Sequence, residues 1–145
     1  MASLQPLLGS IRAAVAYQIW HAALALTLTL PDICAKIEWP EEKKSRTRYR
    51  TWWDEHFGDS YQYGKGPNDH VTGDEVYLLR CAYLHEGGDS LDPNTRKKYN
   101  ATIEKFQFVI SKPHHLTKQG TSVWLDAGTF CEDMCSQTRT GKKKS

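Results

Sequence analysis

The sequence predicts a mainly α-helical domain with a small two-stranded antiparallel β-hairpin inserted before its last helix. Three observations carry this prediction. Apolar residues recur every three or four positions over residues 8–26, which is the spacing of one helix face. A helix-capping signal at 72–75 opens a second apolar segment. Two short runs rich in β-branched and aromatic residues, 106–110 and 122–125, precede the C-terminal segment.

The N-terminal part of the chain predicts two helices that meet at a bend. Pro6 suits a first helical turn, and the apolar stripe continues to Leu30. Pro31 suits the first turn of a new short helix over 32–38, which Pro40 stops. We therefore expect one long helix that ends at a bend near Leu30.

The stretch 13–30 is apolar enough to raise the question of a membrane span or a signal peptide. It carries the polar residues Gln18, Trp20 and His21, no Lys or Arg precedes Arg12, and no small-residue cleavage site follows. We interpret it as a buried helix. The expectation is a soluble, cytoplasmic protein with no membrane contact.

The middle of the chain predicts an amphipathic helix, a loop and a central helix. The first helix runs from Glu41 to Gly58, and the three Gly and one Pro of 58–71 indicate a surface loop. The capping box, in which Thr72 and Glu75 cap each other's backbone, then begins a helix that Gly87-Gly88 ends. That helix is apolar on nearly all sides, which is typical of a central helix.

The C-terminal third predicts the hairpin and one more helix. A polar linker at 89–102 leads to the two strand-like runs, and the Gly-containing loop between them favours an antiparallel pair. A last helix begins near Thr129. Residues 1–137 are expected to form a single domain, followed by a disordered basic tail at 138–145.

Composition restricts the class of protein. Of the 145 residues, 39% are hydrophobic and 25% charged, which is typical of a folded domain. The net charge of +2 is too small to indicate a nucleic-acid-binding protein by itself. The charge is unevenly distributed, however, because one short segment holds Lys43, Lys44, Arg46, Arg48 and Arg50.

Metal and cofactor chemistry finds no support in the sequence. The four cysteines are sparse, and we expect reduced thiols. His114, His115, Cys131 and Cys135 lack the paired spacing of a zinc knuckle. The phosphate-binding loop, the nucleophile elbow and the zinc-protease motif are also missing from the sequence. We expect neither a metal nor another cofactor.

Arg80 and His85 interrupt the apolar surface of the central helix. Their Cα atoms are about 8 Å apart along a helix that rises 1.5 Å per residue, a gap that a long Arg can close. An imidazole can move protons near neutral pH, and a guanidinium can hold a phosphate as its charge builds. Because RNA carries its own nucleophile, the 2′-hydroxyl, these two groups suit cleavage of RNA without metal.

At this segment the sequence resembles the HEPN superfamily, whose members are marked by an Arg, four to six residues, and then a His. Leu79-Arg-Cys-Ala-Tyr-Leu-His85-Glu matches that spacing. The resemblance runs from about Leu24 to Met134. It includes four further segments that are similar to those of small bacterial HEPN-like proteins: 30–38, 48–53, 72–75 and 126–134.

The resemblance implies a HEPN-like helical bundle and a metal-independent endoribonuclease that works as a homodimer on single-stranded RNA. In that family the Arg and His of two subunits face each other across a shared cleft. His85 would act as general base or acid, and Arg80 would stabilise the charge on the phosphate. From the residues themselves, we add six candidates for substrate binding: Lys36, Arg46, Arg48, Arg50, Tyr83 and Glu86.

Two alternatives stay open. Active HEPN members commonly carry Asn, Asp or His after the Arg, where this chain has Cys81, which favours an inactive module that binds a nucleotide, an antitoxin or another partner protein. In a purely structural dimer, Arg80 would instead bond a carboxylate such as Asp32 or Glu75. His85 would then cap the helix end.

Overall fold

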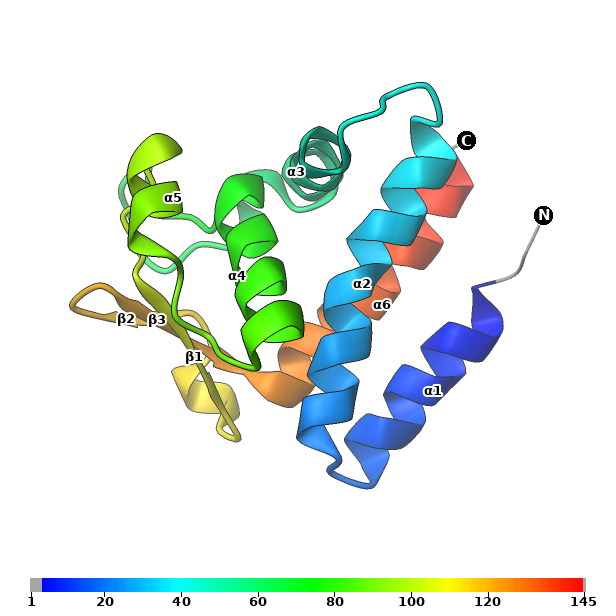
Figure 1. Ribbon diagram of the computed structural model, residues 1–145. Coiled ribbons are helices and arrows are strands. Elements are labelled where there is room, and N and C mark those ends of the chain that lie inside the picture. The colour runs from blue at the N-terminus through cyan, green and yellow to red at the C-terminus, as the bar shows by residue number, and fades with distance from the viewer. Residues whose placement is uncertain (1–3, 145) are drawn as a thin grey trace.

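Helices make up most of the chain, and one small sheet lies beside them (Figure 1). The structure is a computed structural model that describes the backbone of residues 4–144 and the side chains of residues 4–58 and 60–138. The helices are α1 (Gln5–Ala16), α2 (Trp20–Glu38), α3 (Ser45–His56), α4 (Gly73–Glu86), α5 (Pro93–Lys98) and α6 (Ala127–Lys144). The strands are β1 (Lys105–Val109), β2 (Thr117–Gln119) and β3 (Ser122–Asp126), and Gly58–Ser60 and Lys112–His114 form single 3-10 turns.

The first two helices meet at Tyr17–Ile19, so the predicted bend near Leu30 is wrong. Gln18 has a left-handed backbone (φ 59°), and the Ile19 amide donates to the Ala14 carbonyl over 2.8 Å. Pro31 lies inside α2 and is buried. Although a proline removes one helical hydrogen bond, burial of the surrounding apolar residues holds the helix together through it.

Helix α2 is the centre of the bundle, because it contacts α1, α3, α4 and α6 (Figure 1). The aromatic residues of α3 form the core on one side of it. Tyr49, Trp52 and Trp53 are all at most 1% exposed, and the Tyr49 hydroxyl donates to the Leu28 carbonyl of α2. Helix α3 begins at Ser45 rather than at the predicted Glu41.

Helix α4 confirms its sequence signals. Thr72 and Glu75 form the predicted capping box, and Gly87 ends the helix with a left-handed backbone (φ 70°). Asp54 of α3 adds a second cap, because its Oδ1 accepts from the Gly73 amide over 2.9 Å. A Cβ on Gly73 would lie 2.8 Å from the Arg50 Cα, so only glycine lets the two helices cross this closely.

The sheet has three strands in the order β1-β3-β2, and the predicted two-stranded antiparallel pair is wrong. The two strands found in the sequence, β1 and β3, are parallel, with Phe106 opposite Val123. The antiparallel partner of β3 is β2, which lies in the predicted loop. Strand composition does not determine strand direction, so the sequence pattern could not distinguish these arrangements.

Two further elements differ from expectation. The predicted linker at 89–102 contains α5, which Asp92 caps by accepting from the Thr95 amide over 3.0 Å. Helix α6 extends through 138–144, where a disordered tail is predicted, and Ser145 lies outside the described residues. Thr138 is buried and its hydroxyl donates to the Cys135 carbonyl, so packing of the helix continues into the expected tail.

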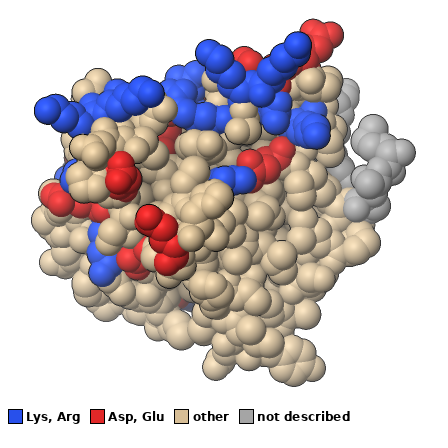
Figure 2. All heavy atoms as spheres, viewed as in Figure 1, with Lys and Arg blue, Asp and Glu red and all other residues tan. Residues whose placement is uncertain are grey.

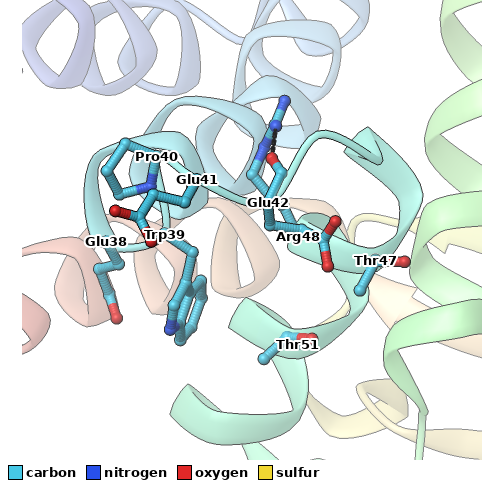
Figure 3. A pocket seen from close by; sticks show the side chains of 8 residues that line it. All are labelled: Glu38, Trp39, Pro40, Glu41, Glu42, Thr47, Arg48 and Thr51. Carbon is cyan, nitrogen blue, oxygen red and sulfur yellow. Dashed lines mark hydrogen bonds between the residues drawn. The ribbon is translucent and has the colours of Figure 1, made fainter.

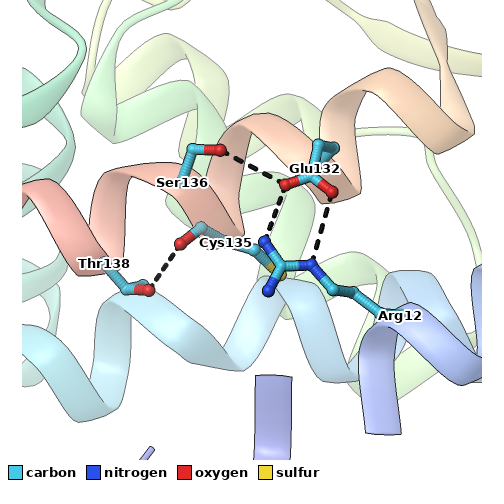
Figure 4. A network of polar contacts seen from close by, with 5 residues as sticks. All are labelled: Arg12, Glu132, Cys135, Ser136 and Thr138. Carbon is cyan, nitrogen blue, oxygen red and sulfur yellow. Dashed lines mark hydrogen bonds and ion pairs between the residues drawn. The ribbon is translucent and has the colours of Figure 1, made fainter. Parts of the chain in front are cut away.

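Helices α1 and α6 are joined at the surface by an ion pair (Figure 4). The Arg12 guanidinium donates through Nε and Nη2 to the two carboxylate oxygens of Glu132, the shorter distance being 2.8 Å. The Ser136 hydroxyl donates to the same carboxylate over 3.2 Å. Both charged side chains are at least one-third exposed, so this contact orients the helices more than it stabilises them.

Candidate functional site

Arg80 is held by α2 rather than left free. Its Nε donates to Asp32 Oδ2 over 2.8 Å, and its Nη1 lies 3.9 Å from the Cys81 sulfur. Burial lowers the pKa of Arg80, but the hydrogen bond and charge of Asp32, together with Cys81, outweigh burial and raise that pKa above its ordinary value. The Arg80 side chain remains 23% exposed, so part of the guanidinium faces solvent.

His85 lies in the last turn of α4 and is exposed. Five residues of helix place its side chain about 140° around the axis from that of Arg80. In the described chain no hydrogen bond joins the two residues, and His85 does not cap the helix, because the backbone of Gly87 does so. Within one protomer, Arg80 and His85 therefore do not form a joint site.

The surface of α4 between these two residues is partly apolar. Cys81 is partly exposed there, and Leu84 is 36% exposed. On the neighbouring α2, Ile33 and Ile37 are 37% and 46% exposed. We call these four residues the α2–α4 strip. Figure 2 shows that charged side chains are sparse over α1 and the first half of α2, in line with a sequence that has none between Arg12 and Asp32.

The other candidates near α4 have different surroundings. Lys36 is exposed one helical turn after Asp32, and thus on the same side of α2 as the Arg80 ion pair. Tyr83 is half-buried, its ring stacks on His21 at 5.0 Å, and burial raises its pKa. Glu86 is exposed at the end of α4. Lys36 is therefore close to Arg80 along α2, whereas Tyr83 serves packing.

The three arginines of α3 do not form one basic face. They occupy alternate positions, and each step of two residues turns about 200° around the helix. Arg46 pairs with Asp74 at 3.5 Å and lies 4.0 Å over the ring of Tyr99. Arg48 donates to a backbone carbonyl before the helix. Arg50, one turn after Arg46, lines a pocket together with Asp74 and Tyr99, the partners of Arg46.

Arg48 belongs to a shallow pocket at the end of α2 (Figure 3). The pocket has a volume of about 440 Å³, and Arg48 Nη1 reaches the Glu42 carbonyl across it. Carboxylates outnumber the single guanidinium, which does not suit an RNA backbone. The lining residues are Glu38, Trp39, Pro40, Glu41, Glu42, Thr47, Arg48 and Thr51.

Basic side chains gather elsewhere, along one edge of the molecule over α5 and the start of α3 (Figure 2). The contact between Arg46 and Tyr99 brings the end of α5 beside the basic segment before α3. Sequence reasoning missed this arrangement, although Arg96-Lys97-Lys98 was a signal for it. We call the exposed lysines of these two segments the basic edge: Lys43, Lys44, Lys97 and Lys98.

The chain matches no known family model, no curated protein and no solved structure. None of the described helices is long and apolar enough to cross a membrane. In residues 4–144, no three His, Cys, Asp or Glu side chains gather as a metal site. All four cysteines are free thiols, and burial raises the pKa of Cys131 to about 11.

Proposed function

We propose that this protein is a HEPN-like, metal-independent endoribonuclease with a composite site built from Arg80 and His85 of two subunits. It would act on single-stranded RNA in the cytoplasm, need no cofactor, and have a HEPN-like helical bundle as its fold. The observation that carries the proposal is the placement of both side chains on α4, one on each side of a partly exposed apolar surface. Each residue can therefore meet a second copy of the helix.

The exposure of the two side chains supports this chemistry. Asp32 occupies Nε of Arg80 and the Cys81 sulfur accepts one N–H of Nη1 at 3.9 Å, which leaves Nη2 and the second N–H of Nη1 as donors for phosphate oxygens. His85 is exposed in the last turn of α4 and can reach a ribose bound outside the protomer. Lys36 lies next to this ion pair and adds positive charge where a phosphate would bind.

A dimer would complete the site, because Arg80 and His85 point to different sides of α4 within one chain. The α2–α4 strip supports a second copy as the partner, because its partly exposed apolar side chains lie on the two helices that the ion pair between Arg80 and Asp32 joins. In a twofold dimer, the same surface of both subunits forms the interface. The strip of one subunit would then face the strip of the other, and Arg80 of one subunit can approach His85 of the other.

The reaction follows from the chemistry of RNA. His85 accepts the proton of a 2′-hydroxyl, the 2′-oxygen attacks the adjacent phosphorus, and Arg80 stabilises the charge that builds on the phosphate oxygens. The bond to the 5′-oxygen breaks, that oxygen takes a proton from water, and His85 returns the proton it accepted to the solvent. The products are a 2′,3′-cyclic phosphate and a free 5′-hydroxyl, and the proposed reaction needs no metal.

The second candidate is an inactive HEPN-like module that binds a nucleotide or a protein such as an antitoxin. The ion pair between Arg80 and Asp32 favours it, because a guanidinium already paired to a carboxylate has less charge to offer a phosphate. Cys81 favours it as well, since its thiol is a much weaker hydrogen-bond donor than the amide of Asn.

The two candidates differ in one assay. Single-stranded RNA is incubated in EDTA with the wild-type chain, Arg80→Ala and His85→Ala, and the ends of the fragments are identified. The proposal predicts cyclic-phosphate ends with the wild type and a loss of at least about a hundredfold in rate with either variant. Equal cleavage by all three chains contradicts it, and RNA binding without cleavage by the wild type selects the inactive module.

A further inference from the structure

A second pocket lies between α3, the start of α4, the loop 58–71 and the segment after α5. We call it the loop pocket. Its volume of about 610 Å³ is in the range of small-molecule sites, and Arg80 and His85 do not line it. The side chains that matter below are Arg50, Asp54, Tyr63, His70 and Tyr99.

The loop 58–71 is folded so that it forms one wall of this pocket. Its two arms pair through a bridge between Gln62 and His70, and the Tyr63 amide donates to the Asp69 carbonyl over 3.0 Å. The Asp69 side chain accepts from the Gly66 amide and closes the tip. The loop thus holds Tyr63 and His70 toward the start of α4.

Most of the acidic side chains in the pocket already have partners. Glu75 accepts from the Thr72 amide over 3.0 Å as part of the capping box. Asp74 pairs with Arg46 at 3.5 Å. Asp54 differs, because only its Oδ1 is used, by the Gly73 amide. The second oxygen of Asp54 makes no hydrogen bond to a described residue and can accept from a ligand, and Oδ1 of Asp74 is a further acceptor without a hydrogen-bond partner.

Two nitrogen groups in the pocket make no hydrogen bond to a described residue, although the charge of Arg50 acts on the nearby Asp54 carboxylate. The Nδ1 atom of His70 is buried and makes no hydrogen bond in the described chain. Leaving such an atom without a partner is costly, and a bound ligand would remove that cost. Arg50, one helical turn before Asp54, makes no hydrogen bond to a described residue and can hold an anion at the same opening.

The remaining walls suit a flat aromatic ligand. Tyr63 and Tyr99 both line the pocket and are half-buried. The guanidinium of Arg46 covers Tyr99 at 4.0 Å, which fixes the position of that ring. Arg46 also ties the pocket to the basic edge, where lysines can meet phosphates. A polycationic ligand would be repelled at this edge.

We propose that the loop pocket binds a guanine base and the phosphate attached to it. Guanine presents two adjacent N–H donors on its pairing edge, which a carboxylate with a free oxygen can accept. The pairing edges of adenine, cytosine and uracil place an acceptor beside their donor, so they would meet Asp54 with repulsion. Arg50 would take the phosphate, and the tyrosine rings would stack on the base.

Binding is measured by calorimetry on the His85→Ala chain in EDTA, so that cleavage cannot interfere. The ligands are guanosine, adenosine, cytidine and uridine monophosphates, and a five-nucleotide RNA with one central guanine. The proposal predicts that guanosine monophosphate binds at least tenfold more tightly than the other three. The affinity of the RNA relative to the mononucleotide then distinguishes a nucleotide sensor from a substrate subsite.

The key variant is Asp54→Asn, because asparagine can still accept from the Gly73 amide and so keeps the helix cap. Glu55→Gln is the matched control, since it removes the same charge from the next, exposed residue of α3. We expect Asp54→Asn to weaken guanosine monophosphate at least tenfold and Glu55→Gln to leave it unchanged. Equal binding of all four nucleotides, no binding, or an unaffected Asp54→Asn chain overturns the proposal without bearing on cleavage by Arg80 and His85.

Discussion

The Nε atom of Arg80 lies 2.8 Å from Oδ2 of Asp32, so an ion pair joins α4 to α2. Both side chains are about one-quarter exposed, and a pair of this kind contributes at most about 1 kcal/mol to stability. The pair does more to orient Arg80 than to hold the fold together. A catalytic role of Arg80 therefore predicts that its substitution affects RNA cleavage more than stability, whereas a structural role predicts that cleavage follows stability.

Arg80→Lys and Asp32→Asn test that separation. Lysine keeps the charge but cannot present two nitrogens to a phosphate, so we expect RNA cleavage to fall at least about tenfold. Asp32→Asn leaves the guanidinium intact, and cleavage should stay within about threefold of the wild type. Both variants should unfold within about 1 kcal/mol of the wild type in urea. If both lose more stability than that and activity follows stability, Arg80 is structural.

The α2–α4 strip makes a prediction about assembly. Leu84→Asp places a charge on an apolar surface, and we expect it to convert the proposed dimer to a monomer and to abolish the proposed cleavage. Ile110→Asp is the matched control, because Ile110 is 70% exposed and follows β1, outside the α2–α4 strip. Molar mass is measured by light scattering. A Leu84→Asp chain that stays dimeric and active would place the interface elsewhere.

Replacing two helical glycines by alanine should change stability in opposite directions. Gly9 in α1 has no atom within 4 Å of an added Cβ, so Gly9→Ala should raise the free energy of unfolding by about 0.5–1 kcal/mol. Gly73 touches the backbone of Arg50, so Gly73→Ala should lower it by more than about 1 kcal/mol. Urea denaturation measures both, and a neutral Gly73→Ala would contradict the close crossing of α3 and α4.

His115 predicts a loss of stability on mild acidification. Burial lowers its pKa from the ordinary value of 6.5, against the opposing effects of Asp133 at 3.9 Å and of Asp126. Its Nδ1 accepts from the Asp126 amide over 3.0 Å, which requires that nitrogen to be unprotonated. The unfolded chain therefore binds a proton more readily than the folded chain. The stabilisation is complete above the ordinary value and is lost as the pH falls below it.

Denaturation at about pH 7.5 and about pH 5.5 checks this, because these values bracket the ordinary titration of histidine. The wild type should lose about 0.5–1 kcal/mol more than His115→Gln over that interval. His114→Gln, at the exposed neighbouring residue, should behave like the wild type. A His115→Gln chain with the same pH dependence as the wild type would show that other groups set it.

The correct predictions share a local cause. The capping box and the Gly87 end of α4 involve residues a few positions apart, so the sequence contains the whole signal. The predicted bend at Pro31 was wrong because burial of the helix in the tertiary structure decides whether a proline ends it, and this burial depends on parts of the chain far from Pro31. The strand directions likewise depend on β2, whose three residues have no strand pattern of their own.

In the candidate site, too, features set by nearby residues were predictable from the sequence and features set by the tertiary structure were not. The placement of Arg80 and His85 on one helix was predictable, and so was Asp32 as a partner of Arg80. The loop pocket was not, because α3, a loop, the start of α4 and the segment after α5 meet there only in three dimensions. Arg46, Arg48 and Arg50 show the limit of counting charges, since Arg46 is paired with Asp74 and Arg48 bonds a backbone carbonyl on another side of α3, whereas Arg50 lines the loop pocket.

Mixing two inactive chains tests the composite site most directly. Arg80→Ala and His85→Ala are unfolded together, refolded as a mixture, and assayed on RNA in EDTA. If each site takes Arg80 from one subunit and His85 from the other, each mixed dimer regains one intact site, and the mixture should recover about a quarter of the wild-type rate. A mixture that forms dimers yet stays as inactive as the separate variants would contradict a site shared between subunits.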